Sequence, residues 1–131
     1  MSAEPHMLLV DDAAALRRSL VRLFQRRGWR VTEARDGVEA LSLLRTTSFD
    51  LLLTDMRMPR MGGMGLMEAI RSELGASMPA VVLSGYHDHS EARLRELGVV
   101  AVLAKPADPA ELLDVCTRSV GGVHPAASDP S

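Results

Sequence analysis

Five short apolar segments, separated by stretches with helical periodicity, constrain the fold of this chain more than any other feature. The segments are residues 7–10, 30–34, 51–54, 80–83 and 99–104. Most of them are continuously apolar, as expected for strands that are covered on both faces of a sheet. Single helices between successive strands favour parallel pairing with right-handed crossovers. The sequence therefore predicts an α/β fold with a doubly wound, five-stranded parallel sheet.

Apolar residues at helical spacing predict five helices around that sheet. These helices are expected over residues 13–27, 38–45, 64–74, 90–97 and 109–120. Gly28 ends the first helix, and Asp108 caps the last one, with Pro109 at its first position. One domain over residues 7–120 follows, after a short N-terminal extension at 1–6. Residues 121–131, rich in Gly, Pro, Ala and Ser, are expected to be a disordered tail or the stub of a linker.

Composition excludes several functional classes. The net charge is −2, which gives no basic surface for nucleic acid or for an anionic membrane. Cys116 is the only cysteine, which excludes an intrachain disulfide framework and a cysteine-based zinc site. The longest apolar run, 99–104, is too short to span a membrane. We also expect no signal peptide, because residues 1–6 lack a basic region followed by an apolar one. We expect a cytoplasmic domain without direct nucleic-acid or membrane binding.

Polar residues follow four of the five predicted strands, where ligands bind in sheets of this kind. Three of them are carboxylates: Asp11, Asp12 and Asp55. Crowded carboxylates repel one another unless a cation is present, and Mg²⁺ prefers such oxygen ligands. Asp12 could instead cap the following helix, whereas Asp55 precedes no helix that needs a cap. The second strand ends in nothing comparable.

Ser84 and Lys105 complete this set of strand-end residues. The other fourteen basic residues are arginines, so Lys105 is the single lysine of the chain. A compact ammonium suits a site beside a phosphate or a carboxylate, although genome composition also explains an excess of arginine. The Ser84 hydroxyl could bind one oxygen of an anion held at Asp55, with Lys105 neutralising another. Alone, Ser84 and Gly85 would be an ordinary turn pair.

These motifs together resemble the receiver domain of bacterial two-component response regulators, over residues 7–120. The matching pieces are Leu8-Leu9-Val10-Asp11-Asp12, Asp55 with Met58-Pro59 and Gly63 after it, Leu83-Ser84-Gly85, and Lys105-Pro106. Domains of this family have the flavodoxin-like, CheY-like form of the doubly wound fold, in agreement with the strand and helix order predicted above.

The resemblance implies a phosphoacceptor. Asp55 would take a phosphoryl group from the phosphohistidine of a sensor histidine kinase or a phosphotransfer protein. Asp11, Asp12 and Asp55 would hold Mg²⁺, together with the main-chain carbonyl of Arg57. The chain would be no conventional enzyme, because it would catalyse only its own phosphotransfer and slow autodephosphorylation.

The resemblance also implies a switch. Ser84 and Lys105 would bind the phosphoryl oxygens, and the Lys105–Pro106 peptide bond would be cis. Movement of the loops that carry these residues would change a surface formed by the fourth helix, the fifth strand and the last helix. A downstream protein or a fused output domain would bind there, and a homodimer could form.

Three positions leave alternatives open. Val102 stands where many family members have an aromatic residue that rotates with the switch, so a phosphorylation-independent interaction module is the second interpretation. A Mg²⁺-dependent phosphatase would carry a second aspartate two residues after its nucleophile, but Arg57 occupies that position. We hypothesise that Arg57 and Tyr86, which flank the approach to Asp55, set the lifetime of the phosphorylated state.

Overall fold

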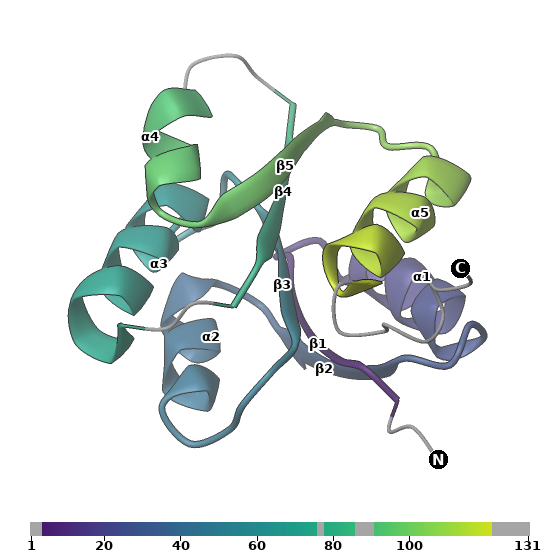
Figure 1. Cartoon of the computed structure of the whole chain (residues 1–131), viewed down its shortest axis with the longest axis horizontal. Helices are drawn as coiled ribbons and strands as arrows, with labels where there is room; N and C mark the ends of the chain where they lie inside the picture. The colour runs from purple at the N-terminus through teal and green to yellow at the C-terminus, as the bar shows by residue number, and fades with distance from the viewer. Residues whose placement is uncertain (1–3, 76–77, 86–90, 122–131) are drawn as a thin grey trace.

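A single parallel sheet forms the centre of the computed structural model, which describes residues 4–75, 78–85 and 91–121 (Figure 1). Its strands are β1 (His6–Val10), β2 (Arg30–Ala34), β3 (Leu51–Asp55), β4 (Ala80–Ser84) and β5 (Val99–Ala104). They pair in the order β2-β1-β3-β4-β5, all in parallel. The chain moves outward from β1 to β2 and then returns to β3. The switch point of the topology therefore lies between β1 and β3, where ligands bind in such sheets.

Helices cover both faces of the sheet, as predicted. They are α1 (Ala14–Gln25), α2 (Gly37–Leu44), α3 (Gly63–Ala69), α4 (Glu91–Glu96) and α5 (Pro109–Ser119). Helices α1 and α5 lie on one face, and α2, α3 and α4 lie on the other (Figure 1). The predicted cap of α5 is present, because the Asp108 carboxylate accepts a hydrogen bond from the Glu111 N–H at 3.0 Å.

Two details of the helices differ from the expectation. The helix predicted over 64–74 is α-helical only to Ala69 and continues as a π-helical turn, η1 (Ile70–Leu74), that ends at Gly75 in a left-handed conformation. The N-cap of α1 is Ala13, with no side-chain cap, so Asp12 does not cap this helix. The Ala13 N–H instead donates to the Asp11 carboxylate at 2.9 Å.

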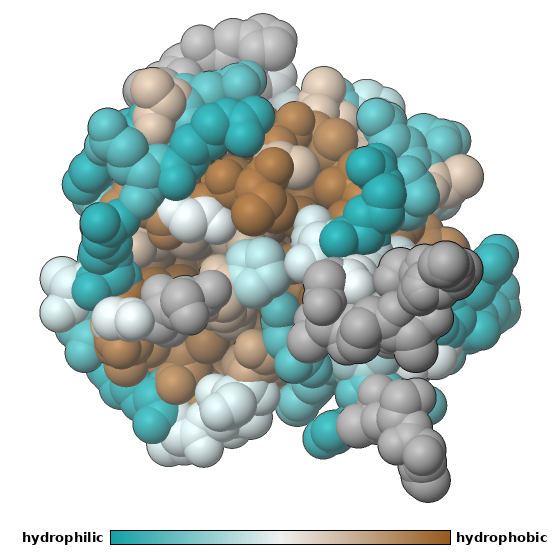
Figure 2. Space-filling model, viewed as in Figure 1, coloured by the Kyte–Doolittle hydropathy of each residue, from teal (hydrophilic) through white to brown (hydrophobic). Residues whose placement is uncertain are grey.

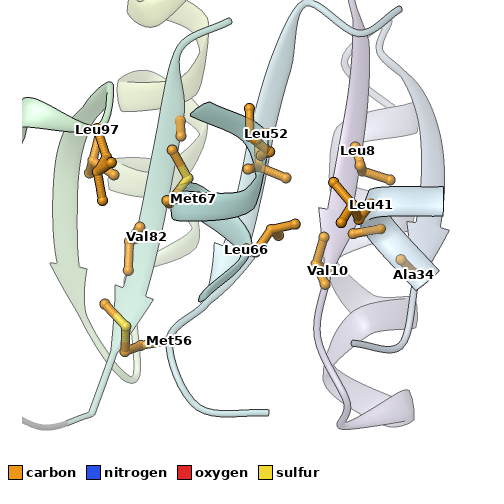
Figure 3. Close-up of a cluster of buried hydrophobic side chains, with 14 of the residues drawn as sticks. Leu8, Val10, Ala34, Leu41, Leu52, Met56, Leu66, Met67, Val82 and Leu97 are labelled. Atoms are coloured by element: carbon orange, nitrogen blue, oxygen red, sulfur yellow. The ribbon is translucent and has the colours of Figure 1, made fainter. Parts of the chain in front are cut away.

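Two apolar clusters, one on each face of the sheet, form the core. The first packs strand residues against α2, α3 and α4, and Figure 3 shows Leu66 and Met67 of α3 among the strand residues Leu52 and Val82. The second packs the opposite strand positions against α1 and α5. Leu52 and its neighbour Leu53 belong to different clusters, and both are fully buried. Burial on both faces explains why the inner strands β1, β3 and β4 are almost entirely apolar. No helix among the described residues is long and apolar enough to cross a bilayer.

Candidate functional site

Three carboxylates meet at the carboxyl edge of the sheet, beside the switch point. Asp11 follows β1 directly, and Asp55 is the last residue of β3, the strand that pairs with β1. One oxygen from each of Asp11, Asp12 and Asp55 lies within 4.8 Å of the other two. Asp11 and Asp55 are buried, whereas Asp12 is exposed. The topology thus brings together carboxylates that are more than forty residues apart in the sequence.

The carboxylate of Asp11 has hydrogen-bond partners for only one of its two oxygens among the described residues. Its Oδ1 accepts the Ala13 N–H, but its Oδ2 is buried without a hydrogen-bond partner there. Burial, and then the neighbouring charges of Asp55 and Asp12, raise the pKa of this carboxyl above its ordinary value. A buried carboxylate oxygen without a partner is unfavourable. A divalent cation would satisfy that oxygen and relieve the repulsion among the three acids, so this donor set fits Mg²⁺.

Lys105 provides the positive charge of the site. Its Nζ lies 3.1 Å from Oδ2 of Asp55, and its backbone N–H donates to the Ser84 carbonyl at 3.0 Å. The other Asp55 oxygen, Oδ1, accepts the Met56 N–H at 2.9 Å. The Lys105–Pro106 peptide bond is cis, which confirms that expectation. Both oxygens of Asp55 are therefore held in defined positions beside an ammonium group.

Ser84 and Arg57 complete the predicted set. Ser84 is the buried last residue of β4, the strand beside β3, and Ala104 is its partner on β5. Arg57 lines a pocket of about 290 Å³ together with Asp55, Gly85 and Lys105. A second hollow, on the side of Asp12, is also lined by Arg57. The structure thus places every predicted site residue at one edge of the sheet, while their chemical roles stay predictions.

The sequence of residues 7–117 matches the model of the response regulator receiver domain. This chain belongs to the response regulator receiver domain family. The membership predicted from the motifs is confirmed, and the receiver domain is a signalling domain of two-component systems. Its five-stranded parallel sheet with helices on both faces is the fold of its structural neighbours.

Two known proteins are similar in sequence to most of this chain. A response regulator receiver protein of Anaeromyxobacter sp. is 41% identical over 109 residues, which are 82% of this chain and 45% of that protein. The Regulator of RpoS of Escherichia coli K12 is 39% identical over 101 residues, or 76% of this chain and 30% of that protein. This receiver chain thus spans less than half the length of these relatives.

Solved structures agree with this fold. A response regulator receiver protein from Pseudomonas putida is 34% identical, with a TM-score of 0.82 and coverage of 90% of this chain and 99% of that one. The receiver domain of the Francisella response regulator 1452 is 27% identical, also with a TM-score of 0.82, and the coverage is 92% and 99%.

Sequence reasoning missed two arginines next to this receiver site. Arg17 of α1 donates from Nη1 to the Asp11 carbonyl at 2.8 Å and from Nε to Glu33 of β2 at 2.8 Å. Arg60, in the loop after β3, binds the buried carboxylate of Asp36. Asp36 lies two residues after β2, so the loop after the second strand carries a buried carboxylate that pairs with Arg60 and is not one of the three clustered acids. The helical pattern of α1 does not by itself predict the contact between Arg17 and β2. That contact also depends on the strand order, which places β2 beside β1.

The positions that left alternatives open are placed as follows. Val102 on β5 is half-buried, pairs in register with Val82 and packs against the first apolar cluster. Arg57 borders the pocket at Asp55. Tyr86, the other residue expected to set the lifetime of the phosphorylated state, lies outside the described residues.

Proposed function

We propose that Asp55 accepts a phosphoryl group from the phosphohistidine of a sensor histidine kinase or a phosphotransfer protein. The observation that supports this most is the setting of the Asp55 carboxylate, which is buried between the Lys105 ammonium and the acidic residues Asp11 and Asp12. An Asp55 oxygen would form a bond to phosphorus while the bond between phosphorus and the histidine nitrogen breaks. The product is an acyl phosphate, and attack by water would later release inorganic phosphate.

Mg²⁺ is the cofactor that the acidic cluster suits. Asp11, Asp12 and Asp55, with the carbonyl of Arg57, would hold the ion. When bound, it would neutralise negative charge on the transferred group, which is most of what catalysis of phosphoryl transfer requires. The response regulator TrrA of Thermotoga maritima, a structural neighbour that is 24% identical with a TM-score of 0.76, was solved in complex with Mg²⁺-BeF. Our assignment depends on the donor set of this chain, because that likeness extends to the fold alone.

Ser84 and Lys105 would bind the oxygens of the phosphoryl group on Asp55. Phosphorylation adds roughly −1.5 to −2 charge and strong acceptor oxygens. Lys105, now paired with Asp55, would shift toward these oxygens, and the Ser84 hydroxyl would bind another. Ser84 ends β4 and Lys105 directly follows β5, and each leads into a loop, so their movement would change the surface beyond β4 and β5.

The partner surface would be the face formed by α4, β5 and α5. Figure 2 shows apolar residues over β5 between the more hydrophilic surfaces of α4 and α5. Val100 on this edge strand is 45% exposed, and Ala101, Val102 and Leu103 are half-buried. A downstream protein, a fused output domain or a second copy of this chain would cover these side chains.

Intact-mass measurement after incubation with acetyl phosphate and Mg²⁺ tests the proposal. We expect a gain of one phosphoryl group, lost in Asp55→Asn and after addition of a chelator. Asp50→Asn is the matched control, because Asp50 is an exposed carboxylate just before β3, at the far end of the same strand. No gain in the folded protein would contradict the proposal. It would favour the phosphorylation-independent module, for which Val102 is the specific observation.

A further inference from the structure

A clasp of four residues, Asp36, Gly37, Arg60 and Met61, joins the loop after β2 to the loop after β3. Nη2 and Nε of Arg60 lie 2.7 and 2.8 Å from Oδ2 of Asp36. The Gly37 N–H donates to the Met61 carbonyl at 2.9 Å. The Asp36 side chain is only 7% exposed, whereas that of Arg60 is 58% exposed. The clasp therefore consists of a fixed, buried anion and a more accessible cation that reaches it from the other loop.

Asp36 is an anchor because other groups already hold it. Its Oδ1 accepts the Glu39 N–H at 2.9 Å and caps α2. That backbone N–H and the Arg60 guanidinium lower the pKa of Asp36, so its carboxylate is charged. The neighbouring Gly37 allows the close approach, since a Cβ at this position would lie 2.6 Å from both Cγ and the carbonyl oxygen of Met61.

Arg60 adopts a backbone conformation that would suit glycine better. Its φ is +68°, and it is the sole non-glycine residue with positive φ in the described ranges. The Met61 N–H donates to the Pro59 carbonyl at 2.7 Å, which closes a γ turn around Arg60. A side chain in the left-handed region is unfavourable. The ion pair with Asp36 gives a physical reason for an arginine at this strained position.

The loop that the clasp holds is the one that leads away from Asp55. At its start the Met56 N–H donates to the Leu83 carbonyl, and at its end the Gly63 N–H donates to the Met56 carbonyl. Arg57 lies between these two anchors and borders the pocket at Asp55. Arg60 lies three residues beyond Arg57, so its attachment to Asp36 restrains the segment that presents the Arg57 carbonyl.

We propose that the Arg60–Asp36 ion pair is a positioning device that sets the affinity of the acidic cluster for Mg²⁺. Arg60 and Asp36 are not among the residues proposed to hold the ion or the phosphoryl group, and they would act through the position of Arg57. This inference rests on the proposed function and deepens it. Partners that orient metal ligands from outside the coordination shell commonly change metal affinity tenfold or more when they are removed.

A second ion pair provides a matched control. Nη2 of Arg45 lies 2.9 Å from Oε1 of Glu73, and this contact joins the other end of α2 to η1. Both side chains are about half exposed. Both ion pairs hold one end of α2, but Arg45–Glu73 attaches it to η1, whereas Arg60–Asp36 attaches it to the loop that carries Arg57.

Titration calorimetry with MgCl₂ on the purified chain tests the device. Arg60→Gly removes the guanidinium and suits the positive φ, and Asp36→Asn keeps an acceptor for the cap of α2 without the charge. We expect each variant to bind Mg²⁺ about tenfold more weakly, and the double variant to bind no more weakly than either. Arg60→Lys should recover part of the affinity, and Arg45→Ala and Glu73→Gln should stay within about twofold of the wild type.

Two outcomes would overturn the inference: wild-type Mg²⁺ affinity in both Arg60→Gly and Asp36→Asn, or equal weakening in Arg45→Ala. Intact mass with acetyl phosphate on the same samples separates the two proposals. If the clasp variants lose Mg²⁺ affinity but the wild type takes up no phosphoryl group, the clasp stands and the phosphoacceptor proposal fails. If all samples are phosphorylated and bind Mg²⁺ equally, the phosphoacceptor proposal stands and the clasp proposal fails.

Discussion

The two ends of β3 differ in what they bury. Leu52 and Leu53, in the first half of the strand, are fully enclosed by the two apolar clusters. Asp55, at the end of the strand, is also buried, but its neighbours are an ammonium and two further carboxylates. Burial of each leucine stabilises the fold by roughly 1.5–3 kcal/mol. Burial of crowded carboxylates does the opposite unless a cation is bound.

The contrast shows how one strand serves two purposes. The apolar interior provides the free energy of folding, and the carboxyl edge keeps charges that the fold by itself does not need. Such charges are expected where a ligand satisfies them, and Asp11 Oδ2 is the group for which this is most evident. Substitutions in the interior should therefore lower stability and leave Mg²⁺ binding unchanged. Substitutions at the carboxyl edge should raise stability in the absence of metal and weaken Mg²⁺ binding.

The largest effect on stability is expected in the interior. Phe24 of α1 is fully buried, with its ring 5.5 Å from that of Trp29 in an edge-on arrangement. Phe24→Ala should lower the free energy of unfolding by about 3–5 kcal/mol, measured by urea denaturation. Mg²⁺ binding by the remaining folded protein should not change. The exposed Val100 gives the control, since Val100→Ala should have little effect. A small loss in Phe24→Ala would mean that the second apolar cluster does not carry the stability assigned to it.

A substitution at the acidic edge should change the free energy of unfolding in the opposite direction. In metal-free buffer, Asp11→Asn should raise the free energy of unfolding by about 1–2 kcal/mol, because it removes a buried charged oxygen without a partner. Mg²⁺ at ten times its dissociation constant should stabilise the wild type by about 1.4 kcal/mol. The same concentration should leave Asp11→Asn nearly unchanged. Denaturation with and without MgCl₂ measures both effects, and equal stabilisation of the two proteins would contradict a metal site at Asp11.

Two buried carboxylates should also give opposite pH dependences. The pKa of Asp36 is lowered in the folded state, so its stabilising contribution is complete above its unfolded pKa, near 3.8, and is lost as the pH falls through the folded value. Asp36→Ala should therefore lower stability by about 1 kcal/mol at pH 7 and by less in acid.

The pKa of Asp11 is raised, mainly by burial, so its unfavourable contribution is absent below pH 3.8 and grows as the pH rises through the folded value. The advantage of Asp11→Asn in metal-free buffer should grow with pH over that range. Denaturation curves from pH 3 to pH 7 test both directions. If the stability difference from wild type changed with pH in the same way for Asp36→Ala and Asp11→Asn in sign and slope, the contrast drawn between the capping carboxylate and the carboxylate at the acidic edge would be wrong.

The smallest effect concerns Cys116 on α5. This thiol is fully buried in the second apolar cluster, and burial raises its pKa to about 12. The native protein should therefore react with Ellman's reagent at pH 8 only as fast as it unfolds, and fully in denaturant. Rapid reaction of one thiol in the native state would show that this part of the interior opens readily.

The sequence was sufficient to predict much of the fold, for reasons visible in particular residues. Residues 99–104 are apolar throughout and end at Lys105-Pro106, so β5 was predicted with its observed bounds. Asp108 and Pro109 marked the start of α5 in the same way. The π-helical turn at Ile70–Leu74 could not be predicted, because its apolar spacing is also that of an α-helix.

The strand-end residues of the site could be predicted from the sequence, but the arginine contacts that hold the neighbouring segments could not. Asp55 and Ser84 end strands, Asp11 and Lys105 directly follow strands, and the parallel topology alone brings these four residues to one edge. The contacts of Arg17 and Arg60 depend on how loops and helices approach one another. Fourteen arginines occur in the chain, and nothing in their local sequence distinguishes the two that lie beside the site.

The most direct test of this account is to locate the phosphoryl group. After incubation with acetyl phosphate and Mg²⁺, borohydride reduces an aspartyl phosphate to homoserine, and tandem mass spectrometry of the peptides identifies the position. The account predicts homoserine at position 55, and none when Mg²⁺ is chelated before the phosphodonor is added. Homoserine at another carboxylate, or unmodified Asp55 in a folded, Mg²⁺-loaded sample, would contradict it.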